Sequence, residues 1–242
     1  MKVDLERLAE GYSHRQPSKA LLARAARAIS ELQLGPASLV VDVGGGPGAH
    51  AAAFRASGAR VSVVDPSPGM WERAGTSGAW VTGGRGESLP LRDDVADLVW
   101  FHLSLHHMKW IDAVTDAVRV CRPGGEVRIW TMGAAHFERS LMAQWFPSVP
   151  SIDAARFPDP DAVEDLLVDL GVSHVRHGVE VEKKRKPAGE WLAAVDGGFI
   201  STTQLIPPQE FAAGRARFLV SHPDPGEVLE YEMRFDWVFG VV

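Results

Sequence analysis

The stretch VVDVGGGPG, at residues 40–48, constrains the fold of this chain more than any other feature. Branched apolar residues surround one acid, and four glycines and a proline follow within five positions. A short apolar run of this kind predicts a buried strand of a parallel sheet. The glycines predict a turn in which the backbone comes very close to a bound molecule, because a residue without a Cβ atom leaves room for it.

Strand and helix patterns alternate after this turn. We expect helices at 20–34, 49–56, 70–74 and 113–120, and strands at 60–65, 80–82, 96–101 and 126–132. This alternation predicts an α/β fold with a doubly wound, mainly parallel sheet. Ligands on such sheets bind at the carboxyl ends of the strands, which is where Gly44, Asp65 and His102 are expected to lie.

The final third of the chain predicts a different pairing. A helix is expected at 161–170 and a strand at 175–182, and residues 229–239 alternate between apolar and mostly charged side chains. Alternation with one solvated face is typical of antiparallel strands. The last two strands are therefore expected to close a seven-stranded sheet as an antiparallel edge hairpin.

Segments 133–158 and 186–227 fit none of these elements and are rich in aromatic residues and proline. Both should leave the sheet on its ligand side, so we expect them to form a small cap over the site. Residues 1–242 then make a single domain, in which 1–132 form the cofactor-binding half.

Composition argues against several classes of function. The net charge of −6 leaves no global basic surface for nucleic-acid binding, and the basic run at 183–186 is expected to be a solvated strand end. A single cysteine, Cys121, offers neither a disulfide nor a metal-ligand spacing, and no metal is expected. The first residues lack a signal-peptide pattern and no stretch is apolar enough to span a membrane. We expect a cytoplasmic protein without nucleic-acid or membrane partners.

The glycine turn fits two classes of adenosine cofactor. Gly44, Gly46 and Ala49 match the dinucleotide fingerprint G-x-G-x-x-G/A, and Asp65 stands where an acid binds ribose hydroxyls. Asp42 discriminates between the two classes. A carboxylate at this position would repel a pyrophosphate, whereas it suits a ligand with a cationic amino group.

Five ordered stretches between residues 40 and 131 resemble the class I S-adenosylmethionine-dependent methyltransferases. They are D-x-G-x-G-x-G at Asp42, Gly44, Gly46 and Gly48, then VSVVDPSPGM, GGRGESLPLRDDVADLVW, LSLHHM and RVCRPGG, with a weaker echo in YSHR near the beginning. Five motifs in the family's order are far more specific than one glycine loop. The resemblance implies S-adenosylmethionine as the cofactor.

The resemblance also implies a role for each matched position. Asp42 is expected near the cofactor's amino group, and Asp65 is expected to accept hydrogen bonds from both ribose hydroxyls. The remaining implied contacts are the glycine loop Gly44, Gly46 and Gly48 at the methionine part, Pro66, Ser67 and Met70 beside the adenine, Gly86 with a backbone N–H to the ring, His102 and Leu103 beneath the sulfonium, and Tyr12 and Arg15 over the cofactor's carboxylate.

The chain departs from the family at the adenine end. Similar members usually read GDAEALPF, in which the acid pairs with the adenine amino group, but the aligned residue here is Arg85. An arginine cannot accept that hydrogen bond. Two alternatives follow: Glu87 takes the role, or stacking and backbone contacts alone hold the adenine.

Methyl transfer from a sulfonium is an in-line displacement, so the protein mainly aligns the acceptor and excludes water. A base is needed only where the acceptor must lose a proton. His106 and His107 are the catalytic candidates, with helix packing as the alternative explanation, and His136, Glu138 and Arg139 are further candidates.

An aromatic acceptor pocket is expected from the distribution of tryptophan. Trp110, Trp130, Trp145 and Trp191 are expected at strand ends or in cap segments, where with His136 they would line the pocket. Packing explains each of them singly, but as a group they favour a hydrophobic or aromatic small molecule.

The sequence therefore predicts a small-molecule methyltransferase, with secondary metabolism as a candidate setting, and leaves oxygen, nitrogen and carbon acceptors open. Three alternatives remain: a cyclase or isomerase on the same fold, a non-catalytic protein that binds S-adenosylmethionine, and an NAD-dependent oxidoreductase.

Overall fold

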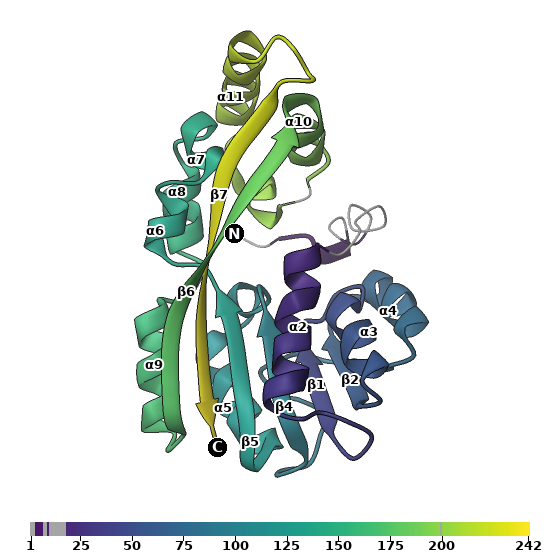
Figure 1. Cartoon of the computed structure of the whole chain (residues 1–242). Coiled ribbons are helices and arrows are strands. Elements are labelled where there is room, and N and C mark those ends of the chain that lie inside the picture. Colours follow the sequence, from purple (N-terminus) through teal and green to yellow (C-terminus); the bar gives the residue numbers. More distant parts are fainter. Residues whose placement is uncertain (1–2, 7–8, 10–17, 199) are drawn as a thin grey trace.

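The computed structural model describes residues 3–6, 9, 18–198 and 200–242. Within them one seven-stranded sheet has the order β3-β2-β1-β4-β5-β7-β6 (Figure 1). Its strands are β1 (Leu39–Val43), β2 (Arg60–Asp65), β3 (Trp80–Gly83), β4 (Ala96–His102), β5 (Cys121–Thr131), β6 (Ser173–Pro187) and β7 (Val228–Val241). The first five strands pair in parallel, whereas β7 pairs antiparallel with both β5 and β6. The predicted doubly wound sheet with an antiparallel edge is confirmed.

Helices cover both faces of this sheet. They are α2 (Lys19–Glu31), α3 (Ala49–Ala56), α4 (Pro68–Ala74), α5 (Trp110–Val120), α6 (Ala134–Phe137), α7 (Leu141–Trp145), α8 (Val149–Ala154), α9 (Pro160–Asp169), α10 (Ala188–Asp196) and α11 (Pro208–Ser221). Apolar residues of α2 and α3 pack on one face, and those of α5 and α9 pack on the other. The helix and strand patterns near the glycine turn are correct to within a few residues, and α3 and β2 have the predicted bounds.

Strand β1 is the centre of the fold. All five of its residues are buried, and Val40 packs in one core while Val41 and Val43 pack in the other. The strand lies between β2 and β4, and the strand order reverses beside it: the chain runs outward from β1 through β2 to β3 and then returns to β4 on the other side of β1. A crevice is expected outside the carboxyl ends of strands at such a reversal.

The two C-terminal strands extend well beyond the sheet. Strand β7 pairs with β5 only through residues 236–241, and its first half pairs with β6 alone. Helices α7, α10 and α11 gather around this extension (Figure 1). They share a separate apolar core that includes Phe146, Trp191, Phe218 and Leu229.

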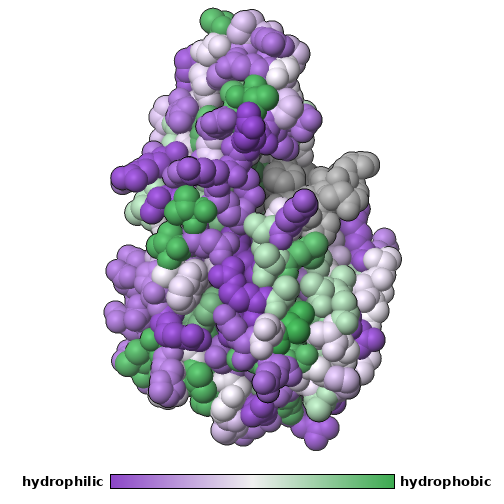
Figure 2. All heavy atoms as spheres, viewed as in Figure 1, coloured by the Kyte–Doolittle hydropathy of each residue, from purple (hydrophilic) through white to green (hydrophobic). Residues whose placement is uncertain are grey.

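Strand β6 is longer than the predicted strand at 175–182. The basic run at 183–186 lies inside β6, because β7 continues opposite it as far as Val228. Two of these residues form ion pairs, Lys184 with Glu182 and Arg185 with Glu230. Figure 2 shows apolar side chains scattered among hydrophilic ones on the face it presents. Over the described residues, none of the helices combines the length and apolarity needed to cross a membrane.

Candidate functional site

A cavity of about 360 Å³ lies at the carboxyl ends of β1, β2 and β4. The predicted site residues that line it are Asp42, Gly44, Gly46, Asp65, Pro66, Ser67, Met70, Gly86, Glu87, His102, Leu103, His106 and His107. Residues not predicted for the site also line it, among them Leu21, His50, Arg85, Ser104, Met108 and Arg156. The structure therefore brings together most of the positions that the motifs single out. Tyr12 and Arg15 lie outside the described residues, so their predicted contacts stay predictions.

The glycine turn after β1 forms one wall of the cavity. Gly44 and Gly46 have φ values of +66° and +53°, in the left-handed region that glycine tolerates best. A Cβ atom on Gly44 would lie 2.5 Å from the Cβ atom of Ser104. Ser104 is fixed there because its hydroxyl donates to the carbonyl of Val43 at 2.7 Å. The backbone of Gly44 therefore lies so close to Ser104 that contacts within the protein already exclude a Cβ atom at this position.

Gly48 has a different place from its two neighbours in the motif. It is the N-cap of α3 with φ +81°, and a Cβ atom on it would lie 3.0 Å from the Cα atom of Ala74. It does not line the cavity. Gly48 allows α3 to pack against α4, whereas Gly44 and Gly46 face the cavity.

Asp65 ends β2 with its carboxylate held in place. Its Oδ2 accepts from the Gly46 N–H at 3.1 Å, and its Oδ1 accepts from the Ser67 N–H at 2.9 Å. Burial raises the pKa of this carboxyl, and the two backbone hydrogen bonds oppose the rise. Each oxygen keeps a further lone pair, so the carboxylate can accept two hydroxyl donors in a fixed orientation.

Asp42 is buried beside the glycine turn, with 1% of its surface exposed. Its Oδ2 has no hydrogen-bond partner among the described residues. Burial, with a smaller effect from the Asp65 charge, raises the pKa of Asp42 to about 7. A buried carboxylate oxygen without a donor is costly. The site is therefore suited to a ligand that brings a cationic donor, such as an ammonium group.

The adenine end contains Glu87 and Arg85, as the departure from the family pattern suggested. Glu87 Oε1 accepts from the Lys109 N–H at 2.9 Å, so one of its two oxygens is already engaged. Gly86 is buried between them, where a Cβ atom would lie 2.5 Å from the sulfur of Met108. Both alternatives for holding the adenine remain predictions.

His102, at the end of β4, is oriented by a residue that the sequence did not single out. The Arg24 guanidinium lies 2.9 Å from His102 Nε2. Because arginine can only donate, Nε2 accepts and the ring proton lies on Nδ1. Arg24 is 2% exposed and forms ion pairs with Glu180 and Glu182 of β6. One signal was available: an arginine stands on the apolar face of a predicted helix, which requires buried partners.

His106 and His107, in the short 3-10 helix Leu105–His107, are tilted relative to one another with ring centroids 4.0 Å apart. His106 stacks on Phe157 with ring centroids 3.9 Å apart, and burial lowers the pKa of His106 well below the usual value. Part of His107 faces solvent, but desolvation of its ring and the Arg156 charge lower its pKa to about 4. Both imidazoles are therefore uncharged at neutral pH and are weak bases.

The predicted aromatic pocket residues lie elsewhere. Trp130 packs in the sheet core with the Arg24 guanidinium 4.4 Å above its ring, and Trp110 packs against the opposite core. Trp145 and Trp191 pack against Phe218 in the core around the β6–β7 extension. Nδ1 of His136 accepts from the Arg234 N–H at 3.3 Å, and burial lowers the pKa of this ring to about 4. The structure does not bring these five side chains to the cavity, since core packing takes up their apolar surface.

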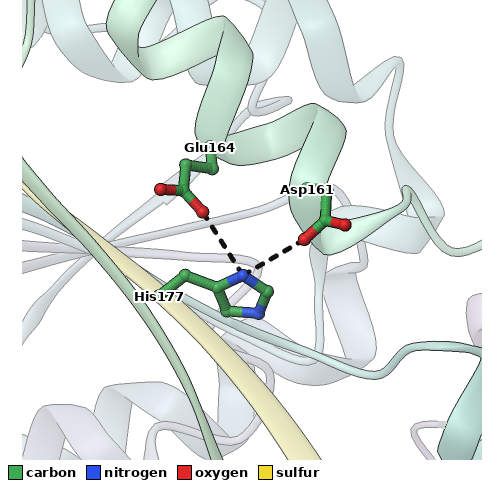
Figure 3. Close-up of side chains that lie close together, drawn as sticks. All are labelled: Asp161, Glu164 and His177. Carbon is green, nitrogen blue, oxygen red and sulfur yellow. Dashed lines mark ion pairs between the residues drawn. The ribbon is translucent and has the colours of Figure 1, made fainter.

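A second polar cluster lies away from the cavity, between α9 and β6. Asp161, Glu164 and His177 converge there, and each carboxylate lies 3.4 Å from His177 Nδ1 (Figure 3). Asp236 lies 3.6 Å from the other ring nitrogen. The three side chains are also the group among the described residues whose donor atoms could hold a metal ion. Because Asp161 is 84% exposed, we interpret the cluster as ion pairs that hold α9 against β6.

The sequence comparisons agree with this geometry. Residues 41–129 match the family model of a methyltransferase domain. An uncharacterized methyltransferase of Mycobacterium avium (strain 104) is 39% identical over 92 residues, which cover 36% of each chain. A malonyl-(acyl-carrier protein) O-methyltransferase of Erwinia billingiae (strain Eb661) is 33% identical over 128 residues, which cover 51% of this chain and 50% of that protein. The matched segments span between 28% and 58% of the length of the curated relatives.

Solved structures share the fold over almost the whole chain. A protein of Anabaena variabilis, described as a candidate methyltransferase of an antibiotic biosynthesis pathway, has a TM-score of 0.68 at 19% identity and covers 91% of this chain and 97% of its own. A SAM-dependent methyltransferase of Aquifex aeolicus has a TM-score of 0.57 at 15% identity, with coverages of 97% and 98%. Taken with the ordered motifs and the cavity they line, these matches show that residues 41–129 resemble a methyltransferase domain and that the chain has the fold of solved S-adenosylmethionine-dependent methyltransferases.

Proposed function

We propose that this protein transfers a methyl group from S-adenosylmethionine to a small-molecule acceptor bound in the cavity. The observation that carries the proposal is the pairing of two carboxylates at the glycine turn. Asp65 is oriented by two backbone N–H groups, and Asp42 holds an oxygen without a donor. An adenosine cofactor with an ammonium group satisfies both at once.

Each cavity residue then has a defined task. Asp65 accepts from the ribose hydroxyls, Asp42 pairs with the amino group, and Gly44 and Gly46 let the methionine part approach the backbone. When bound, the cofactor supplies a methyl group on a sulfonium, which an acceptor atom displaces in line. His102, held by Arg24, and the uncharged pair His106 and His107 line the part of the cavity in which we place the acceptor.

The cap assignment also belongs to this proposal. Arg156 comes from segment 133–158 and lines the cavity, and its guanidinium donates to Ser201 and Thr202 of segment 186–227. Both segments therefore reach one edge of the site. We place the acceptor between this edge and the glycine turn.

The other functions are less well supported. A pyrophosphate beside Asp42 would face a buried carboxylate, which argues against an NAD-dependent oxidoreductase. The matched family model and the curated relatives are methyltransferases, which favours methyl transfer over a cyclase or a non-catalytic binding protein.

A labelling experiment tests the proposal. The full chain is incubated with methyl-labelled S-adenosylmethionine and a small-molecule extract, and label is followed into the extract together with release of S-adenosylhomocysteine. We expect labelled product, lost with Asp65→Asn and kept with Asp93→Asn, an exposed carboxylate remote from the cavity. Tight binding of S-adenosylhomocysteine without any labelled product would instead favour the non-catalytic alternative.

A further inference from the structure

Arg156 places a positive charge at the cap edge of the cavity. It follows α8, lines the cavity, and keeps only 13% of its side chain exposed. We propose that Arg156 forms a carboxylate-binding subsite, so that the acceptor is a small carboxylic acid anchored by this guanidinium. The inference rests on the proposed function and adds the chemical class of the substrate.

The partners of Arg156 leave its charge incompletely balanced. Two of its five N–H groups donate to hydroxyls, to Ser201 at 2.9 Å and to Thr202 at 3.2 Å. The nearest carboxylate, Asp153, lies 3.6 Å away, and it already accepts from the Thr202 hydroxyl at 2.6 Å. Donors of the guanidinium therefore remain available for an anion that enters the cavity.

Two buried arginines of this chain, Arg24 and Arg128, each pair with two carboxylates. Arg24 forms ion pairs with Glu180, at 2.9 Å, and Glu182. Arg128 has Glu126 at 2.6 Å and Glu31 at 2.7 Å. Both are 2% exposed, and neither lines the cavity. A buried guanidinium normally requires such partners. Arg156, which is partly buried at the cavity, has no second carboxylate within ion-pair distance among the described residues.

The surroundings separate this subsite from the cofactor end. The Arg156 charge helps to lower the pKa of His106 and of His107, so it lies near the histidine pair. The pKa of Asp42, by contrast, is raised by burial and by the Asp65 charge. The uncharged imidazoles bring no competing anion to the guanidinium. A bound carboxylate would therefore occupy the acceptor side of the cavity and would not displace the cofactor's amino group from Asp42.

The chemistry of the donors favours a carboxylate. A planar guanidinium offers parallel N–H groups that match the two oxygens of a carboxylate, with one negative charge against one positive charge. The second arginine that lines the cavity, Arg85, is exposed and adjoins Gly86 and Glu87 rather than the histidine pair. Among the described residues, a doubly charged phosphate monoester bound beside the histidine pair would find one close cation, Arg156.

Matched acid and amide probes test this subsite. The full chain is first saturated with S-adenosylhomocysteine, and benzoate, benzamide, octanoate and octanamide are then titrated by calorimetry. We expect each acid to bind about tenfold or more tightly than its amide, since a hydrogen bond to a charged group is lost with the amide. Arg156→Gln should abolish this preference, Arg156→Lys should keep part of it, and Arg85→Gln should leave it unchanged.

The outcomes separate the subsite from the proposed function. The inference is overturned if neither acid binds at millimolar concentration, if acid and amide bind alike, or if the preference survives in Arg156→Gln. In both Arg156 variants the affinity for S-adenosylhomocysteine, measured first, should stay within about twofold, because Arg156 acts at the acceptor end. Failure of the unmodified protein to bind S-adenosylhomocysteine would instead contradict the proposed function itself. Phenyl phosphate serves as a further probe, and tighter binding of phenyl phosphate than of benzoate would contradict the assignment to a carboxylate.

Discussion

The predicted cofactor half and the predicted cap of this molecule are built in opposite ways. In the first, β1, α3 and β2 follow one another within residues 39–65, and the site consists largely of backbone turns with two carboxylates. In the second, residues from Leu141 to Leu229 come together from segments on either side of β6 and share a separate core. The difference teaches that the proposed cofactor site is formed by residues close together in the sequence, whereas the proposed acceptor site depends on contacts between distant segments. Four substitutions should weaken the affinity for S-adenosylhomocysteine to a decreasing extent: Gly44→Ala, Asp65→Asn, Asp42→Asn and Phe218→Ala.

Gly44→Ala should have the largest effect. The new Cβ atom would meet Ser104 at 2.5 Å in a residue with φ +66°. We expect a loss of about 2 kcal/mol or more in the free energy of unfolding, and a loss of affinity of about 100-fold or more, because strain and displacement of the turn add together. Gly75→Ala is the control, since no atom lies within 4 Å of its Cβ position and its φ of −56° is helical. Urea unfolding and calorimetry measure both quantities, and equal behaviour of the two variants would refute a close-approach role for Gly44.

Asp65→Asn should weaken binding by about 10- to 100-fold, the range expected when hydrogen bonds to a charged acceptor become neutral. The amide keeps the size of the side chain, but its NH2 group cannot accept from the backbone N–H of Gly46 or Ser67, so we expect a lower unfolding temperature as well. Asp93→Asn, at an exposed ion pair with Arg119, is the control and should leave the affinity unchanged. An Asp65→Asn protein that binds normally would remove this residue from the ribose site.

Asp42 should make binding depend on pH. Its pKa is raised to about 7 without ligand, so it must lose a proton to pair with the ligand's ammonium group. The affinity should therefore fall by up to about tenfold for each pH unit from about pH 7 down to pH 5, and level off above that range. In the absence of ligand, the stability of the folded state changes with pH in the opposite direction to the affinity. The folded state binds more protons than the unfolded state between about pH 4 and 7, so the contribution of Asp42 to stability decreases as pH rises through this window.

Asp42→Asn should flatten the dependence of both affinity and stability on pH. The smaller contribution of Asp65, whose pKa is also raised by burial, would remain. Calorimetric titrations and urea unfolding across the same pH range give the comparison. Identical pH profiles for the variant and the unmodified protein would show that the Asp42 carboxyl does not contact the ligand's amino group.

Phe218→Ala should have the smallest effect on affinity and yet a large effect on stability. Phe218 is 1% exposed and stacks on Trp191 with ring centroids 4.7 Å apart. Removing a buried ring of this kind costs about 3–5 kcal/mol, and the affinity should stay within about twofold because no atom of this core lines the cavity. Leu219→Ala, on the same helix but 44% exposed, is the matched control. Loss of binding in Phe218→Ala alone would show that the two regions are not separable.

Much of the cofactor half could be predicted because its signals are local. The residues 49–56 and 60–65 have the predicted bounds, since a glycine turn, an alanine-rich helix and a β-branched strand each follow from nearby side chains. The match of residues 41–129 to a methyltransferase domain bears out the family resemblance on which the site residues were named. Gly48 is an exception, because it was predicted at the cofactor but does not line the cavity. Within the same glycine motif, Gly44 and Gly46 line the cavity, whereas Gly48 allows α3 to pack on α4.

The acceptor side could not be predicted in the same way. A tryptophan carries the same apolar surface in a pocket as in a core, and Trp130, Trp145 and Trp191 all lie in cores. Arg156 lines the cavity and is held there by hydrogen bonds to Ser201 and Thr202, distant contacts that no pattern around residue 156 indicates. Arg24 was accessible to sequence reasoning, since its position on an apolar helix face calls for buried acidic partners.

Calorimetric titration of S-adenosylhomocysteine into the full chain, with NADH as the parallel ligand, tests the central claim most directly. One site per chain is expected, with a dissociation constant in the micromolar range for S-adenosylhomocysteine and no detectable binding of NADH. The absence of S-adenosylhomocysteine binding at millimolar concentration, or preferential binding of NADH, would contradict the assignment of the Asp42–Asp65 cavity to a sulfonium cofactor.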